Sequence, residues 1–230
     1  MNGLFVHILP AEQLPEAAAE HIANVLERGI YERDSCSIAF SGGGTPNPMF
    51  EALAQRPVDW PSVELFQADE RLVPAGHPDH NFTALDSHLI SKVPLSPDRV
   101  HPMETEASDP AAAAARYERT LARRAPHGLG MVHLGLGDDG HTASWPPGDT
   151  TVLDSPKLVE VVGPYRDYLR MTLTPRAIRN TGSILWMVAG SGKAPALKQL
   201  VDADPRIPAW HARVEGSTIL ADEAAGRLLQ

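Results

Sequence analysis

Apolar and polar positions follow two alternating periods along this chain, and the two periods predict strands and helices in turn. Residues 4–9 and 37–40 are short apolar runs of strand length, whereas residues 11–33 carry apolar side chains three and four positions apart. The second spacing places the apolar side chains on one face of a helix. The alternation continues to the C-terminus. It predicts further strands at residues 63–67, 99–101, 131–136, 157–162, 169–173, 183–189 and 218–220, and further helices after Pro46, from Asn81, over 110–124, after Thr174, over 194–201 and after Asp222.

Strands that alternate with helices throughout a chain favour one fold class. We predict an α/β fold of the Rossmann-like, doubly wound type, with a mostly parallel sheet and helices on both faces. No internal repeat or linker interrupts the pattern, so residues 1–230 are expected to form a single domain. Ligands of such sheets bind beyond the carboxyl ends of the strands. Polar segments that directly follow a predicted strand are therefore the candidate functional segments.

Composition and charge restrict the classes of function. The chain has 230 residues, 43% of them hydrophobic, and a formal net charge of -9. An acidic chain is not expected to bind nucleic acid, because that function usually needs a basic face. Cys36 is the single cysteine, so no internal disulfide is possible and a reducing compartment is expected. No apolar run approaches the roughly 20 residues that cross a bilayer, so we expect a cytoplasmic protein without a membrane partner.

The segment after the second predicted strand is rich in glycine. It contains Ser41, Gly42, Gly43, Gly44 and Thr45, followed by Pro46. Thr45 is expected to be the N-cap of the next helix and Pro46 its first residue. Consecutive glycines let backbone N–H groups converge on an anion at the positive end of a helix, which makes a phosphate site as plausible as a tight turn without a ligand. The spacing matches neither the dinucleotide nor the Walker pattern, so no nucleotide is expected.

Two carboxylates, a glycine and a histidine follow the strand at 131–136. Gly140 separates Asp139 from His141, so a sharp bend can present both side chains to one cleft. Histidine changes its charge near neutral pH, which is the property that a general base needs. For an isolated Asp-Gly-His segment, a solvated polar turn is the alternative interpretation.

Two more predicted strands end in charged segments. Asp69-Glu70-Arg71 follows residues 63–67, and taken alone it fits a surface charge cluster. Lys193 ends a Gly-Ser-Gly-Lys segment in or beside the first turn of a helix, where the helix dipole disfavours a cation. This unfavourable position indicates an anionic ligand. We expect the charged strand ends and the glycine-rich loop to share one cleft.

A metal site is not expected. The sequence has no His-x-x-x-His or Cys-x-x-Cys pair, and two-ligand pairs of that kind are typical of zinc sites. His77 and His80 lie in the loop 72–80, which is rich in turn-forming residues, and we expect both to be solvated.

Five segments, in this order, resemble the 6-phosphogluconolactonases, a family related to the glucosamine-6-phosphate deaminases. The resemblance extends from about residue 35 to the C-terminus. It departs from the family pattern at Trp145-Pro146-Pro147, where Leu-Phe-Pro is usual, and at His80, where serine is common. The first departure is expected to reshape the pocket wall. The matching segments are Ser41–Pro46, Asp69–Pro74 with Asn81, Gly135–Ser144, Arg170–Thr174 and Gly190–Leu197.

This resemblance implies hydrolysis of 6-phospho-D-glucono-1,5-lactone to 6-phospho-D-gluconate, the second step of the oxidative pentose phosphate pathway. It implies that His141 deprotonates water, that Asp139 or Asp69 orients His141, and that no metal or organic cofactor takes part. Arg71 is the candidate partner of the oxyanion or of substrate hydroxyl groups. The phosphate of the substrate is expected to lie against the glycine-rich loop, Lys193 and Arg170. The full set of residues expected to bind the substrate is Ser41, Gly42, Gly43, Gly44, Thr45, Arg71, Asn81, Arg170 and Lys193.

Two alternative functions stay open. An aminosugar-phosphate deaminase or isomerase of the related group carries a carboxylate five residues after the histidine, and here that position is Pro146. A non-catalytic sugar-phosphate sensor is expected to carry a DNA-binding segment, for which this acidic chain leaves no room. The sequence leaves the oligomeric state open.

Overall fold

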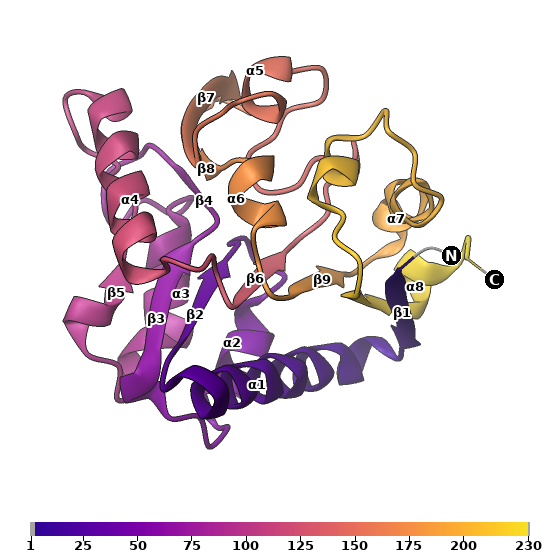
Figure 1. Ribbon diagram of the computed structural model, residues 1–230. Helices are drawn as coiled ribbons and strands as arrows, with labels where there is room; N and C mark the ends of the chain where they lie inside the picture. The colour runs from indigo at the N-terminus through magenta and orange to yellow at the C-terminus, as the bar shows by residue number, and fades with distance from the viewer. Residues whose placement is uncertain (1–2, 230) are drawn as a thin grey trace.

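A seven-stranded sheet forms the centre of the computed structural model, which describes residues 3–229 (Figure 1). The strand order is β1-β10-β9-β6-β2-β3-β5, and every neighbouring pair is parallel. The predicted α/β class is confirmed, and each strand lies within two residues of its predicted ends. The strands are β1 (Leu4–Leu9), β2 (Cys36–Phe40), β3 (Val63–Gln67), β5 (Val100–His101), β6 (Met131–Leu134), β9 (Ile184–Val188) and β10 (Ser217–Asp222).

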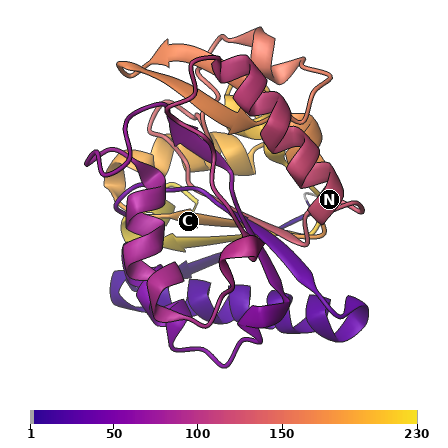
Figure 2. The same ribbon diagram turned by 90° about the vertical axis from the view of Figure 1, so that its left-hand side faces the viewer.

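Helices cover both faces of this sheet (Figures 1 and 2). One face packs against α1 (Leu14–Arg33), α2 (Asn47–Ala54) and α3 (Asn81–His88). The other face packs against α4 (Pro110–Arg124), α5 (Thr150–Leu153), α6 (Pro175–Arg179), α7 (Ala194–Val201) and α8 (Glu223–Gly226), together with a smaller sheet. None of the helices in the described part of the chain is both long and apolar enough to span a membrane.

The strands divide the core into two parts. On β9, Ile184, Trp186 and Val188 belong to one hydrophobic cluster, whereas Leu185 and Met187 belong to the other. Successive side chains of a strand point to opposite faces. All five are buried, as is typical of a parallel strand covered on both sides. This packing fixes the carboxyl ends of the strands, where the predicted functional segments begin.

The strands predicted at 157–162 and 169–173 do not join the large sheet. They form an antiparallel hairpin of β7 (Val159–Tyr165) and β8 (Tyr168–Leu173), and β8 also pairs antiparallel with the short β4 (Asp69–Arg71). The apolar pattern identifies a strand but not the sheet to which it belongs. Asp69–Arg71 follows β3 as predicted, with only Ala68 between them, but its backbone is itself paired. Figure 2 shows the small sheet above the large one.

The start of α2 also differs from the prediction. Pro46 is the N-cap residue, and no side chain caps the helix, so the prediction that Thr45 is the N-cap is wrong. The chain enters the helix through a turn in which Asn47 N donates to Gly44 O at 3.4 Å. The Thr45 side chain is therefore not used by the helix. In contrast, Thr174 and Asp222 accept capping hydrogen bonds at the starts of α6 and α8, the two helices predicted after these residues.

Candidate active site

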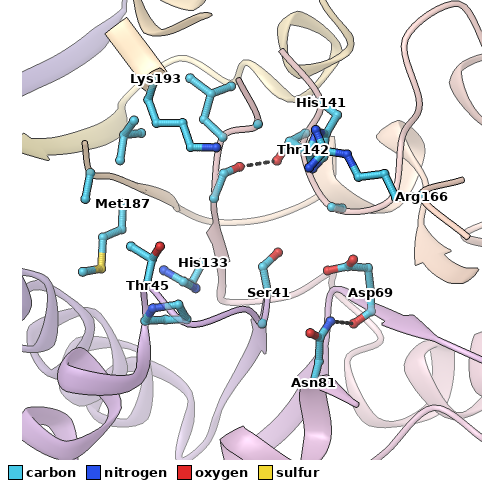
Figure 3. A pocket seen from close by; sticks show the side chains of 18 of the residues that line it. Ser41, Thr45, Asp69, Asn81, His133, His141, Thr142, Arg166, Met187 and Lys193 are labelled. Atoms are coloured by element: carbon cyan, nitrogen blue, oxygen red, sulfur yellow. Dashed lines mark hydrogen bonds between the residues drawn. The ribbon is translucent and has the colours of Figure 1, made fainter. Parts of the chain in front are cut away.

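One cleft lies at the carboxyl ends of β2, β3, β6 and β9 (Figure 3). The strand order reverses between β2 and β6, because β3 and β5 continue on one side and β9 and β10 on the other. Ligands of open α/β sheets bind at such a reversal. The cleft has a volume of about 200 Å³. Its lining includes the predicted residues Ser41, Gly42, Thr45, Asp69, Arg71, Asn81, His141, Arg170 and Lys193.

Three predicted residues do not line the cleft. Gly43 and Gly44 are in the loop beside it, where an added Cβ atom would meet nothing within 4 Å. Asp139 lies behind His141 as its partner. Gly42 differs from the next two glycines, because a Cβ there would fall 2.3 Å from Cγ of Asn81. Only glycine at position 42 lets the loop approach α3 this closely.

His141 and Asp139 form the predicted pair. Nδ1 of His141 lies 2.5 Å from Oδ1 of Asp139 and 3.1 Å from the hydroxyl oxygen of Tyr165. An ionised carboxylate only accepts hydrogen bonds, so Nδ1 carries the proton and Nε2 is left as an acceptor. A Cβ on Gly137 would fall 1.9 Å from Nδ1 of His141. The turn therefore needs glycine at position 137 for the imidazole to lie against it.

Neighbouring donors keep Asp139 ionised. The Tyr165 hydroxyl donates to Oδ2 at 2.6 Å, and Arg166 Nη2 donates to the same oxygen at 3.3 Å. Burial opposes the negative charge, but the hydrogen bonds from Tyr165 and His141 outweigh it and hold the pKa of Asp139 well below its usual range. Burial and the contact with Asp139 raise the pKa of Tyr165 to about 12. At neutral pH the phenol therefore donates and the carboxylate accepts.

Of the two carboxylates predicted to orient His141, only Asp139 contacts it. Asp69 is held by two other residues. Its Oδ2 accepts a hydrogen bond from the Ser144 hydroxyl at 2.7 Å, and the backbone carbonyl of Asp69 accepts one from Nδ2 of Asn81 at 3.2 Å. Figure 3 shows the Asp69 carboxylate at the edge of the cleft below His141. This carboxylate is placed to bind a substrate hydroxyl or a water molecule.

The small sheet brings two arginines together. Arg71 of β4 lies opposite Arg170 of β8. Arg71 Nη1 donates to the carbonyl of Asp79 at 2.6 Å, and Arg170 Nε donates to the carbonyl of Tyr165 at 2.9 Å. Burial and then the positive charge of Arg71 lower the pKa of Arg170. Two cations held this close repel each other, and an anionic ligand would offset the repulsion.

Lys193 is the cation at the other end of the cleft. It ends a short 3-10 turn and is the N-cap residue of α7, as predicted. Figure 3 shows its side chain extending over the cleft on the side of Thr45 and Met187. Within residues 3–229 its ammonium group makes no hydrogen bond and no ion pair, although, after the hydrogen bond from Arg166, its charge helps to lower the pKa of Asp138. Its ammonium group is available to a ligand.

The chain is similar to known proteins over most of its length. A family model described as glucosamine-6-phosphate isomerases/6-phosphogluconolactonase matches residues 10–220. The chain belongs to this family. It is 36% identical to a 6-phosphogluconolactonase of Synechocystis sp. over 227 residues, or 94% of each chain. It is similar to the crystal structure of 6-phosphogluconolactonase from Thermotoga maritima, with a TM-score of 0.87, 28% identity, and coverage of 95% of this chain and 99% of that one.

The related deaminases share the fold. A monomeric glucosamine-6-phosphate deaminase matches with a TM-score of 0.83 at 19% identity, over 98% of this chain and 99% of that one. At this identity, the match shows the common architecture alone. The description of the matching family names isomerases as well as 6-phosphogluconolactonases, so the residues in the cleft have to discriminate between them.

Three further residues belong to the site and were not predicted. Tyr165 and Arg166 lie at the turn between β7 and β8, and Arg166 binds Asp138 at 2.9 Å as well as Asp139. The Tyr-Arg-Asp segment between two predicted strands was the only signal, and it points to the cleft only once the hairpin is placed. His133 lines the cleft from within β6, where its apolar neighbours indicate core rather than site.

Two expectations about the surroundings of the cleft are wrong. Trp145 is fully buried, donates from Nε1 to the carbonyl of Leu173 at 2.7 Å and does not line the cleft, so it does not reshape the pocket wall. His80 is buried rather than solvated, because it packs 3.6 Å from the Glu70 carboxylate and contacts Thr83 at 3.1 Å. Across the described residues, no three His, Cys, Asp or Glu side chains are grouped to hold a metal ion.

Proposed function

We propose that this chain hydrolyses 6-phospho-D-glucono-1,5-lactone to 6-phospho-D-gluconate. One observation carries the proposal: Nδ1 of His141 is bound by Asp139, and the ring borders a cleft that also holds Arg71, Arg170 and Lys193. Hydrolysis of an activated ester needs a positioned water, a base, and stabilisation of the oxyanion that forms. The relatives named above carry this activity in their names.

The His141 ring moves the protons of the reaction. Water attacks the lactone carbonyl carbon while Nε2 of His141 takes a proton from that water, and Asp139 stabilises the resulting imidazolium. The carbonyl oxygen becomes an oxyanion, for which Arg71 is the candidate partner. The bond from the carbonyl carbon to the ring oxygen then breaks, and the ring oxygen takes the proton from the imidazolium. The product is an open-chain acid, which ionises in water.

The substrate phosphate is proposed to bind at the opposite end of the cleft. The backbone of Gly42–Thr45 and the ammonium group of Lys193 favour a dianion there. Arg170 is assigned to the phosphate from the sequence alone, and its contact with the Tyr165 carbonyl gives it a second candidate role beside the reacting carbonyl. Asp69, Ser41 and Asn81 remain candidates for the hydroxyl groups.

A direct assay tests the proposal. The protein is added to freshly prepared lactone, and loss of the lactone is compared with the spontaneous rate in the same buffer, with His141→Asn as the matched control. Acceleration by the unsubstituted protein that the variant lacks supports the proposal, and an unchanged rate overturns it. Ammonia release from glucosamine 6-phosphate is measured in parallel. We expect none, because Pro146 occupies the position of the deaminase carboxylate and lies outside the lining of the cleft.

A further inference from the structure

His133 is a buried histidine that the proposed reaction does not use. It lies in β6, is 2% exposed, and lines the cleft. Neither Nδ1 nor Nε2 has a hydrogen-bond partner among the described residues. Its ring instead packs near the rings of Phe40 and Phe50, with centroids 5.9 and 6.4 Å away. Buried polar groups are normally hydrogen-bonded, so this side chain requires an explanation.

The other buried histidines in residues 3–229, His80 and His101, each have at least one hydrogen-bond partner in the fold. His101 lies with Nε2 2.6 Å from the Glu64 carboxylate. Nδ1 of His80 contacts the Thr83 hydroxyl at 3.1 Å, and its Nε2 lies 3.6 Å from the Glu70 carboxylate without a hydrogen bond. Both are away from the lining of the cleft. Of these three histidines, only His133 has both ring nitrogens unpaired, and only His133 borders the cleft. An unpaired ring at that place is explained by a partner that arrives with the ligand.

The position of the ring selects a part of the substrate. Figure 3 shows His133 near Thr45 and Met187, on the side of the cleft where Lys193 extends, while His141 and Asp69 lie on the other side. In a 1,5-lactone, the carbonyl is C1 and the phosphate is carried by C6. If C1 faces His141 and the phosphate faces Lys193, the hydroxyl nearest the phosphate end is the one on C4.

The surroundings of the ring favour an uncharged partner. Phe40, Phe50 and Met187 are apolar, and a dianion among them would lose hydration without compensation. Burial, opposed only by the nearby Ser41 carbonyl, lowers the pKa of His133 to about 4. That carbonyl does not reach hydrogen-bond geometry with either ring nitrogen. A neutral ring has one donor and one acceptor, and a hydroxyl group can satisfy either of them.

We propose that His133 is a specificity-determining residue that hydrogen-bonds the C4 hydroxyl of the lactone and so discriminates against the C4 epimer. This inference rests on the proposed lactonase function. A site built to hydrogen-bond a hydroxyl rejects a substrate that lacks it, because the buried group of the protein is then left unpaired. Inverting C4 turns the hydroxyl away from the ring and has that effect.

The test compares the 6-phosphorylated 1,5-lactones of gluconate and of its C4 epimer, galactonate. We expect the unsubstituted protein to prefer the gluconate lactone in kcat/KM by about tenfold or more. His133→Leu should lower kcat/KM for the gluconate lactone by a similar factor, change it less for the epimer, and bring the ratio towards one. His133→Asn, which keeps a donor and an acceptor, should restore part of the preference.

Stability provides the second readout. His133→Leu should leave the Tm unchanged or raise it, because it removes two unpaired buried nitrogens. The matched control is His101→Leu, which removes the partner of Glu64 and should lower the Tm without changing the epimer ratio. The inference is overturned if the unsubstituted protein shows no epimer preference, or if both His133 variants keep the full preference. An absence of lactonase activity in the unsubstituted protein would instead refute the proposed function.

Discussion

The two ends of the cleft are built in opposite ways. At the reaction end, His141, Asp139 and Tyr165 bind one another, and the nearby arginines donate to backbone carbonyls. At the phosphate end, within residues 3–229, the ammonium group of Lys193 has no hydrogen bond or ion pair, and both ring nitrogens of His133 are unpaired. The groups that transfer the proton are therefore paired without a substrate, whereas Lys193, His133 and Nε of Arg71 are not.

This difference follows from what each end has to do. A group that transfers a proton must already stand in a fixed orientation, so its partners belong to the protein. A group that binds the substrate gains most when the substrate supplies the missing partner. Substitutions at the reaction end should therefore change the rate for every lactone, and substitutions at the phosphate end should change the choice between lactones.

Replacing His141 should have the largest effect. We expect His141→Asn to lower kcat by about 10²–10⁴-fold, the usual scale for loss of a general base, with little change in KM. In the unsubstituted protein, kcat should fall in acid, because a protonated ring cannot take a proton from water. The variant should lose this pH dependence. A variant that keeps near-normal turnover would remove His141 from the mechanism.

Substitutions of the two cations Lys193 and Arg170 should distinguish the phosphate end of the cleft from the reaction end. Lys193→Ala is expected to lower kcat/KM for the phosphorylated lactone by about 10- to 100-fold and to leave glucono-1,5-lactone without phosphate unaffected. Arg170→Ala should lower kcat/KM for both lactones, because Arg170 binds the Tyr165 carbonyl beside the reacting pair. If Arg170→Ala behaves like Lys193→Ala, Arg170 belongs to the phosphate end, as the sequence suggests.

Removing the Tyr165 hydroxyl should have a smaller effect. Tyr165→Phe deletes one donor to Asp139 and is expected to lower kcat by about threefold to tenfold. The pKa of Asp139 should then rise towards the ordinary carboxyl value of about 4. A lowered carboxyl pKa stabilises the fold above that ordinary value, and the stabilisation is lost as the pH falls through the folded-state pKa. In Tyr165→Phe this loss should be smaller and should be complete at a higher pH, as Tm measured against pH will show.

Tyr165→Phe should also change how the stability of the protein depends on pH in alkali. The pKa of Tyr165 is raised to about 12, from about 10 for a free phenol. Its contribution to stability is therefore present below about pH 10 and is lost as the pH rises through the folded-state pKa. The Tm of the unsubstituted protein should decline over this range, and the decline should be smaller in Tyr165→Phe. An identical decline in both proteins would contradict the assignment of this hydrogen bond.

Chelation should have no effect. The mechanism uses a base and a water molecule, so prolonged treatment with EDTA is expected to leave kcat unchanged. Activity that is lost on chelation and restored by zinc or manganese would contradict the assignment of the reaction end to His141 and Asp139.

Features encoded by neighbouring residues were predicted, and those that depend on distant pairing were not. The apolar runs of the parallel strands are local, and the polar segments that follow them meet in one cleft. Asp69–Arg71 has no apolar pattern and becomes a strand only through β8. Tyr165 and Arg166 reach the cleft because that hairpin folds over it. His133 sits in an apolar strand, and a single polar residue there does not reveal which neighbours satisfy it.

Only one residue, Ala68, separates β3 from β4, so the number of residues between these strands decides which side chains face the cleft. Ala68 alone connects the two strands, so the register of β4 is set by β3. Asp69 and Arg71 of β4 face the cleft. Glu70, between them, faces the interior and accepts hydrogen bonds from the backbone amides at the start of α3. One inserted residue would exchange these faces. Glu70 would enter the cleft, and the cap of α3 would be lost. An insertion at position 68 is therefore expected to disrupt both the cleft and the start of α3.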